Sequence, residues 1–313
     1  MRIVLKVAFL LSMIASSGIA HAQQPISGAE AMKMFGLDLE TVEIRPVAIG
    51  SGLYALFGAG GNIVASVGVQ GVLIVDDQFP VMVPRIEAAI RQLGGGEIDF
   101  VINTHWHFDH ADGNPALAEN GSWIVAHKNS RQMLTGDHLI NLVDMVVAQP
   151  AYQAAGLPVI TFDDRMQFHF NGERIDLLHF GPAHTTGDVA VLFRGHNVVH
   201  MGDVFVTGTY PFIDADNGGD LDGVIRFSEA VLKEINVETV VIPGHGQIAG
   251  YTELAAYISM LKTIRERIAS LIEQGATLAE VGAANPTAEW DSERGSPARL
   301  LDRAYKSLSR ARD

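Results

Sequence analysis

Three histidines and one aspartate fall within six positions of the chain, in the order His105, His107, Asp109 and His110. The apolar residues 100–102 precede them and predict a buried strand that ends in a loop. Alternate residues of an extended segment point the same way, so His105 and His107 can approach one ion. The chain then turns, and Asp109 with His110 can face a second ion. Imidazole and carboxylate ligands without sulfur suit zinc, with iron or manganese also possible.

Three more histidine or aspartate residues each follow a predicted strand directly and lie in glycine-rich turns. Glycine lets the backbone approach closely, so ligand side chains can crowd around an ion. Metal ligands also need partners that fix their orientation, and by position alone Asp76, Thr104 and Asp188 are candidates for this role. The three residues that follow strands are His184, Asp203 and His245.

Strands and helices must position these residues. Short runs rich in Val, Ile, Leu and Phe alternate with helical runs and no Pro- or Ser-rich linker divides them, which indicates a single α/β domain over residues 23–313. Residues 252–274 carry an apolar stripe at helical spacing that predicts packing on a sheet. Residues 58–62 predict a hairpin turn between two strands. Segment 130–165 has weak periodicity, and it fits either a mobile insert beside the site or a packed irregular connection.

Individual side chains near the ligands receive structural interpretations. Trp106 and Phe108, which alternate with the ligands, are predicted to pack under the metal loop, and His127 is predicted to be structural.

The predicted strands cover residues 53–57, 63–67, 71–75, 100–102, 123–126, 166–170, 174–179, 189–193, 197–200 and 239–242. The predicted helices cover residues 83–93, 130–135, 221–233, 252–274 and 297–309.

The composition limits the class of protein. The chain has 313 residues, of which 48% are hydrophobic and 19% charged, which is typical of a globular protein and excludes a disordered or coiled-coil chain. The formal net charge is −14. Because this charge repels phosphate backbones and anionic lipids, it disfavours nucleic acid and membrane surfaces as partners and leaves a small-molecule substrate.

The first 22 residues predict a cleavable signal peptide. Arg2 and Lys6 precede the apolar run 7–14, and Ala-His-Ala at residues 20–22 is a small-x-small cleavage site. The apolar run is shorter than the roughly 20 residues that a membrane span needs. Removal of Arg2 and Lys6 would leave 20 basic against 36 acidic residues, a net charge of −16. The chain has no cysteine, so an oxidising compartment would leave it unchanged, and we expect a periplasmic or secreted protein.

The order and spacing of the seven candidate ligands resemble the ligand set of the metallo-β-lactamase superfamily, and the resemblance covers roughly residues 53–250. It implies an α/β fold, a four-layer αββα sandwich with a two-metal cleft at one edge of its sheets. It also implies a cofactor of two zinc ions, with iron or manganese as other possibilities. The implied ligands are His105, His107 and His184 for the first ion, Asp109, His110 and His245 for the second, and Asp203 as the bridge between the two.

The same resemblance implies a zinc-dependent hydrolase. A hydroxide between the two ions would attack a polarised carbonyl, while the second ion stabilises the departing group. Asp203 would bridge the ions and Asp109 could also orient the nucleophile, so both are candidate catalytic residues. Tyr210 follows Asp203 closely enough to reach a substrate, and its phenol could donate to a developing oxyanion. Core packing is the alternative role for Tyr210.

The residues around Asp203 bear on the choice of substrate. One β-lactamase subclass of the superfamily has Cys at the Asp203 position and Lys three residues later, where Val206 stands here, and another has Ser or Met at the Asp203 position. An aspartate bridge is more similar to lactonases, thioesterases and related hydrolases, so we expect a lactone, ester or amide substrate. A metallo-β-lactamase that hydrolyses β-lactams is the closest rival, since Arg131 or Arg165 could replace the missing Lys.

Other members of the superfamily fit the sequence less well. A flavodiiron protein would have Glu where His107 stands. A persulfide dioxygenase, whose single iron resembles a site built from His105, His184 and Asp203, is a further alternative, but its cytosolic thiol substrate disagrees with export. Glyoxalase II matches the ligand pattern, yet residues 252–313 show no thiol-tripeptide pocket. A degenerate zinc store would have a broken ligand set, whereas this set is complete.

Overall fold

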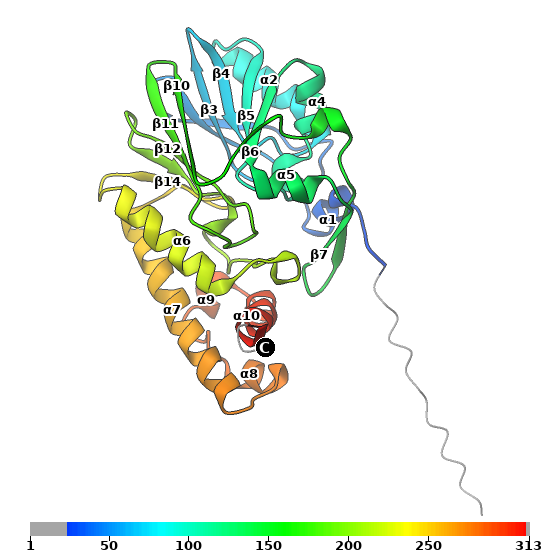
Figure 1. The fold of residues 1–313 in the computed structure, drawn as a ribbon, viewed down its shortest axis with the longest axis vertical. Helices are drawn as coiled ribbons and strands as arrows, with labels where there is room; N and C mark the ends of the chain where they lie inside the picture. Colours follow the sequence, from blue (N-terminus) through cyan, green and yellow to red (C-terminus); the bar gives the residue numbers. More distant parts are fainter. Residues whose placement is uncertain (1–23, 311–313) are drawn as a thin grey trace, which may run out of the picture.

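Two β-sheets lie face to face in the computed structural model, which describes residues 24–310 (Figure 1). The first sheet has seven strands in the order β1-β2-β3-β4-β5-β6-β9, and the second has six in the order β10-β11-β12-β13-β14-β15. Strands β4, β5, β6 and β9 run parallel to one another, as do β13 and β14. Because parallel strands end at the same edge of a sheet, the loops that follow them gather there, as in other open α/β sheets that bind ligands at this edge.

The strands are short and connected mostly by tight turns. Those of the first sheet are β1 (Arg45–Gly50), β2 (Leu53–Phe57), β3 (Ile63–Gly68), β4 (Gly71–Val75), β5 (Ile98–Ile102), β6 (Trp123–His127) and β9 (Ile160–Phe162). Those of the second are β10 (Arg165–Phe170), β11 (Glu173–Leu178), β12 (Ala190–Phe193), β13 (Val198–His200), β14 (Val240–Ile242) and β15 (Ala249–Gly250). A separate hairpin pairs β7 (His138–Asn141) with β8 (Val146–Gln149).

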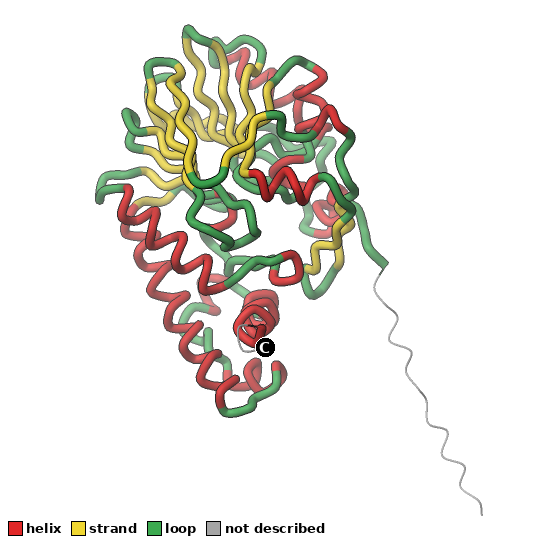
Figure 2. The backbone as a smooth tube through the Cα atoms, viewed as in Figure 1, coloured by secondary structure: helices red, strands yellow, loops and turns green. Residues whose placement is uncertain are grey.

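Helices lie outside the two sheets (Figure 2). The helices between residues 28 and 134 are α1 (Gly28–Met34), α2 (Val83–Gln92), α3 (Phe108–Ala111), α4 (Asn114–Glu119) and α5 (Lys128–Leu134). The helices between residues 221 and 310 are α6 (Leu221–Glu234), α7 (Tyr251–Glu273), α8 (Leu278–Ala284), α9 (Asp291–Arg294) and α10 (Ala298–Arg310). Helices α8 to α10 lie beyond the edge of the sandwich, below α6 in Figure 1.

Side chains of the central strands point alternately to the two faces of their sheet, and the buried side chains form three layers of core. In β4, Leu73 and Val75 face the second sheet, whereas Val72 and Ile74 face the helical layer that contains α2. Both sets are fully buried, as expected for a strand covered on both faces. A third cluster joins the outer face of the second sheet to α6, α7 and α10. Helix, sheet, sheet and helix therefore form four layers, and the predicted αββα fold is confirmed.

Most predicted elements are present within two residues of the expected bounds. The apolar stripe of α7 is buried at Leu254, Leu261 and Ile264, as its spacing predicts, and residues 58–62 form the turn between antiparallel β2 and β3. Segment 130–165 is a packed connection that includes most of α5, the β7–β8 hairpin and β9. Helix α1, strand β1 and the β7–β8 hairpin were not predicted.

Among residues 24–310, no helix combines the length and the apolar character that a membrane span requires. The predicted signal peptide, residues 1–22, lies outside the described residues.

Candidate metal centre

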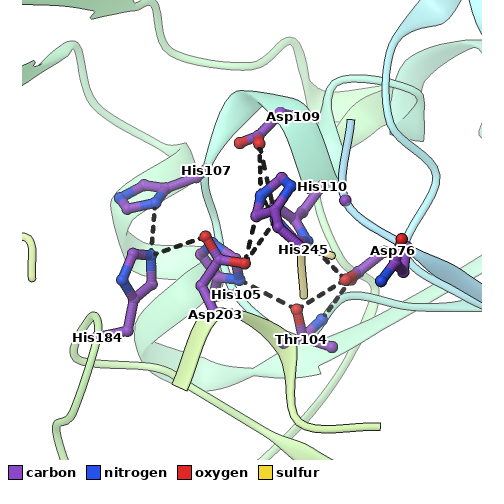
Figure 3. Close-up of polar contacts among 12 residues, drawn as sticks. Asp76, Thr104, His105, His107, Asp109, His110, His184, Asp203 and His245 are labelled. Atoms are coloured by element: carbon purple, nitrogen blue, oxygen red, sulfur yellow. Dashed lines mark hydrogen bonds and ion pairs between the residues drawn. The ribbon is translucent and has the colours of Figure 1, made fainter. Parts of the chain in front are cut away.

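Four connections at one edge of the sandwich bring the seven predicted ligands together (Figure 3). The connection after β5, which includes α3, provides four of them, and the connections after β11, β13 and β14 provide one each. Trp106 and Phe108 are buried beneath this connection, as predicted. In chain order the ligands are His105, His107, Asp109 and His110 from the first sheet, then His184, Asp203 and His245 from the second.

The first group of ligand atoms is buried. The candidate ligand atoms of His105, His107 and His184 all lie within 4.8 Å of one another. His107 Nδ1 and His184 Nε2 are 2.9 Å apart. His105 Nε2 is buried and has no hydrogen-bond partner among the described residues. Since buried polar atoms are almost always paired, this free nitrogen and its two neighbours fit a metal ion of the kind that imidazole binds.

The second group is more open to solvent. Asp109, His110 and His245 also place one ligand atom each within 4.8 Å of the others. His245 Nε2 is 3.1 Å from Asp109 Oδ2 and 3.2 Å from His110 Nε2. The side chain of His110 is fully buried, but that of His245 is 37% exposed. A ligand that enters from solvent therefore meets the second group first.

Asp203 lies between the two groups. Its Oδ1 is 3.1 Å from His110 Nε2 and 3.4 Å from His245 Nε2, and its Oδ2 is 3.8 Å from His184 Nε2. Asp203 also forms a potential ligand group with His105 and His110. One carboxylate thus faces both groups, which is the arrangement that a bridging ligand requires.

Burial and neighbouring charges shift the pKa values of the candidate ligands. Burial and the neighbouring histidines lower the pKa of His105 well below its usual value, so its ring is neutral and can donate a lone pair. Burial would raise the pKa of Asp203, but His245 and His110 hold that pKa well below its usual value. Burial lowers the pKa of His245, yet Asp203 and Asp109 more than offset this and raise it to about 10. A divalent ion would take the place of the proton on His245.

Two of the three predicted orienting residues contact ligands directly. Asp76 Oδ2 lies 2.7 Å from His110 Nδ1, and the same carboxylate accepts hydrogen bonds from the backbone N–H and the hydroxyl of Thr104. Thr104 Oγ1 is in turn 3.0 Å from His105 Nδ1. Both rings are held by the nitrogen that faces away from the cluster, so their Nε2 atoms are left for an ion. Asp188 accepts from the N–H of Thr185, next to His184, at 2.8 Å.

One orienting residue was missed. Asp214 Oδ2 is 3.0 Å from His107 Nε2, which fixes the ring so that Nδ1 faces His184. Asp214 is buried in the irregular stretch between Asp203 and α6. No sequence motif links Asp214 to His107. Their contact becomes visible only in the folded structure.

Glycines leave room for the ligands. A methyl group on Gly61 would lie 2.1 Å from Cε1 of His110, and one on Gly244 would lie 2.0 Å from Oδ1 of Asp203. Neither glycine has a positive φ. Space rather than backbone conformation therefore requires glycine at these two positions.

Asn62 connects the turn before β3 to the His245 loop of the other sheet. Its side-chain amide donates to the carbonyls of Pro243 at 2.9 Å and Gly246 at 3.0 Å. Its backbone N–H donates to the carbonyl of Gly244 at 2.7 Å. The loop that carries His245 is therefore held on both sides of the ligand by one buried amide.

The structure does not bring Tyr210 to the cluster. Its ring packs in the core layer between the second sheet and the helices, and its hydroxyl donates to Asp291 at 2.8 Å and to the carbonyl of Thr287 at 3.2 Å. The predicted catalytic role of Tyr210 is therefore wrong, because the C-terminal helices hold its hydroxyl. The alternative, core packing, is the observed role.

The remaining side chains singled out from the sequence are structural. His127 stacks on His179 at 3.8 Å between ring centroids and accepts from the N–H of Asn129, where it caps α5. Arg131 donates to the carbonyl of Pro158, and Arg165 pairs with Glu234. These contacts engage both guanidinium groups, which argues against either arginine as a substrate-binding cation.

Comparisons with known proteins agree with this site. A family model for the metallo-β-lactamase superfamily matches residues 63–245, a range that contains all seven candidate ligands. A probable metallo-hydrolase of Methanocaldococcus jannaschii is 24% identical over 200 residues, which cover 61% of this chain and 90% of the relative. A hydroxyacylglutathione hydrolase of Gloeobacter violaceus is 25% identical over 225 residues, which cover 67% of this chain and 76% of the relative.

Solved structures show the same fold. A metallo-β-lactamase from Pontibacter korlensis superposes with a TM-score of 0.57 at 16% identity, covering 70% of this chain and 99% of the other. A double mutant of a sec-alkyl sulfatase superposes with a TM-score of 0.66 at 15% identity, covering 86% of this chain and 50% of the other. The family match spans more than half of the chain and includes its complete His and Asp cluster. The protein therefore belongs to the metallo-β-lactamase superfamily.

Proposed function

We propose that this protein is an exported hydrolase that holds two zinc ions and cleaves a carbonyl substrate. The observation that carries the proposal is the placement of Asp203 between two complete groups of ligand atoms. Two divalent ions at such a site supply a nucleophile from water near neutral pH and polarise a carbonyl. Nitrogen and carboxylate ligands without sulfur favour zinc, with iron or manganese as the other candidates.

The residues of the chain have distinct tasks in this reaction. His105, His107 and His184, whose side chains are almost fully buried, would hold the first ion. Asp203, which faces both groups, would contribute a carboxylate oxygen to each ion. Asp109, whose side chain is 14% exposed, faces the open side with His245, and its carboxylate can orient the attacking water and accept its proton.

The surroundings of the cluster support a neutral acyl substrate. Val206 is buried and apolar where a β-lactamase of the cysteine subclass has Lys, and Arg131 and Arg165 are bonded elsewhere. An anionic substrate would therefore lack a charge-assisted contact, which contributes about 1.5–3 kcal/mol, or roughly 10–150-fold in specificity. We infer that lactones and activated esters are preferred over β-lactams.

A thioester is the second candidate substrate. Two of the similar proteins, from Gloeobacter violaceus and from yeast mitochondria, are hydroxyacylglutathione hydrolases, at 25% and 26% identity. The yeast relative matches over 56% of this chain and 57% of its own length. Thioester hydrolysis uses the same attack on a carbonyl, so the same site could perform it.

Location and partners belong to the proposal as well. The signal-like residues 1–22 and the absence of cysteine favour a periplasmic or secreted protein. The net charge of −14 favours a small molecule over nucleic acid or anionic membrane as partner. Detection of the mature chain, beginning near Gln23, in the periplasmic fraction would support this location, and an intact N-terminus in the cytoplasm would contradict it.

Metal analysis and a substrate panel test the proposal. We expect about two zinc ions per mature chain, and kcat/KM values for lactones, aryl esters or thioesters above those for penicillins and carbapenems. Higher values for β-lactams than for every ester, thioester and lactone would favour the β-lactamase alternative. One iron and no zinc, together with oxygen consumption on a persulfide, would favour the dioxygenase alternative.

A further inference from the structure

A second cavity lies beside the metal loop. Its volume is about 530 Å³, within the range of pockets that hold small molecules. Helix α1 and the residues after it form one wall, and the turn before α2, α3 and the end of β8 form the rest. None of the seven candidate metal ligands lines it.

The wall of the cavity is mostly apolar. Leu39, Phe79, Val81 and Phe108 line it, and Phe79 and Phe108 are almost fully buried, with ring centroids 6.0 Å apart. Helix α1 packs directly on Phe108, because a methyl group on Gly28 would lie 2.6 Å from the phenylalanine ring. An apolar ligand body would find a preformed surface here.

Two hydrogen-bond acceptors lie among these apolar residues. Gln149 lines the cavity and is only 2% exposed, yet its Oε1 has no hydrogen-bond partner among residues 24–310. Its amide nitrogen is already used, since Nε2 donates to the carbonyl of Trp106 at 2.7 Å. Asp112 also lines the cavity, and the hydroxyl of Tyr152 donates to one of its oxygens. A buried acceptor left unpaired is rare and costly, so Gln149 points to a missing donor.

Most of the charged residues that line the cavity are acidic. Among the residues that line it, Glu30, Asp38 and Glu40 are acidic and Lys33 is basic. A ligand with a negative charge would be repelled by this set, whereas a cation would be attracted. An ammonium group offers three donors and no acceptor, which matches the two buried acceptors, Asp112 and Gln149 Oε1.

We propose that this cavity is a binding site for a small primary amine, with its apolar body against Phe79, Val81 and Phe108 and its ammonium group donating to Gln149 Oε1 and Asp112. The site is separate from the metal cluster but adjoins it. Phe108 stands between the candidate ligands His107 and Asp109, and Gln149 binds the backbone of Trp106 in the same loop.

Direct binding of n-hexylamine to the zinc-loaded mature protein tests the proposal, because calorimetry detects binding whether or not any ester is hydrolysed. We expect saturable binding with one site per chain at pH 7, and at least 10-fold weaker binding of n-hexanoate, which has the same body and the opposite charge. Failure of the proposed hydrolase function would leave this result unchanged. No saturable binding of the amine, or equal binding of the hexanoate, would overturn the proposal.

Three variants locate the site. Val81→Trp should fill the cavity and abolish binding, and Val69→Trp, at a fully exposed position of the β3–β4 turn, is its matched control. Asp112→Asn and Gln149→Leu should each weaken binding of the amine about 10-fold, since each removes one acceptor and changes little volume. Zinc content and the unfolding midpoint report whether each variant is folded. Unchanged amine binding in the folded variants would place the amine elsewhere, for example on the zinc ions, and would overturn the proposal.

Discussion

Asp203 Oδ2 lies 3.8 Å from His184 Nε2, too far for a hydrogen bond between them. Two bonds to one zinc ion, each of about 2.0–2.1 Å, span at most about 4.2 Å, so this separation suits two ligands of a shared ion. The other oxygen of Asp203 is 3.1 Å from His110 in the second group. A single carboxylate therefore faces both groups and would be a ligand of both proposed ions.

Replacing Asp203 with Ala should remove the bridge. We expect loss of at least one of the two ions and a fall in kcat of about 100-fold or more, since the metal pair supplies several kcal/mol of transition-state stabilisation. Elemental analysis and steady-state kinetics measure the two effects. Asp164→Ala, at an exposed position, is the control. Wild-type metal content and activity in Asp203→Ala would show that the ligand assignment is wrong.

Gly61→Ala should displace His110. The added methyl group would lie 2.1 Å from a ring carbon of this buried histidine, so either the ring or the turn must move. We expect weaker binding of the second ion, by at least about 10-fold in a chelator competition, with the first ion retained. Gly96→Ala has nothing within 4 Å of the new methyl group and should bind both ions normally. Equal affinities in the two variants would contradict this prediction.

Asn62→Asp should loosen the His245 loop. Aspartate has nearly the same shape but cannot donate to the carbonyls of Pro243 and Gly246, and its charge would face two acceptors. We expect second-ion affinity to fall about 10–100-fold, the usual effect of losing a partner that orients a ligand. Isothermal titration of the metal-free protein measures it, with exposed Asn120→Asp as control. If first-ion affinity fell equally, the amide would be supporting the whole fold and not the loop.

His127 should make stability depend on pH. Burial, together with the adjacent His179, lowers the pKa of His127 to about 4. Below about pH 6.5 the unfolded chain gains a proton there that the folded protein takes up only near pH 4, so the free energy of unfolding falls as the pH falls through this window. His127→Asn keeps an acceptor for the cap of α5 and removes the titration.

The measurement for His127 is a series of denaturant unfolding curves between pH 4 and pH 7.5. Relative to wild type, His127→Asn should lose about 1–3 kcal/mol less stability between pH 7 and pH 4.5, and any metal contribution cancels in the difference. Exposed His169→Asn should behave like wild type. Parallel pH profiles for wild type and His127→Asn would contradict the lowered pKa.

The clustering of the candidate ligands was predictable because their signal in the sequence is local. Four of them fall within six positions, and the other three directly follow apolar runs that the structure shows as β11, β13 and β14 or their continuations. Buried strands covered on both faces are nearly continuous apolar runs, so most of the two sheets could also be predicted. Asp76 and Thr104 were placed correctly for the same reason, since both stand at strand ends.

The missed features depend on contacts that sequence spacing does not encode. Strand β1 contains Pro46 and ends at Gly50, which argue against a strand, but it lies at the edge of its sheet, where proline is tolerated. Helix α1 did have a signal, the capping box of Ser27 and Glu30, which could have been used. The Asp214 contact to His107 and the Asp291 contact that holds Tyr210 join residues 81 or more positions apart, so no local pattern could reveal them.

The candidate ligands come from both sheets, so metal binding would also affect the stability of the fold. Four candidate ligands follow β5 in the first sheet and three follow strands of the second, so each bound ion would connect the two sheets. Free metal at 1,000 times its dissociation constant would add about 4 kcal/mol to the free energy of unfolding. The core between the sheets would remain without metal, but the metal-free protein would have the smaller free energy of unfolding. If the proposed ions bind, resistance of the chain to proteolysis would rise with the concentration of free metal around it.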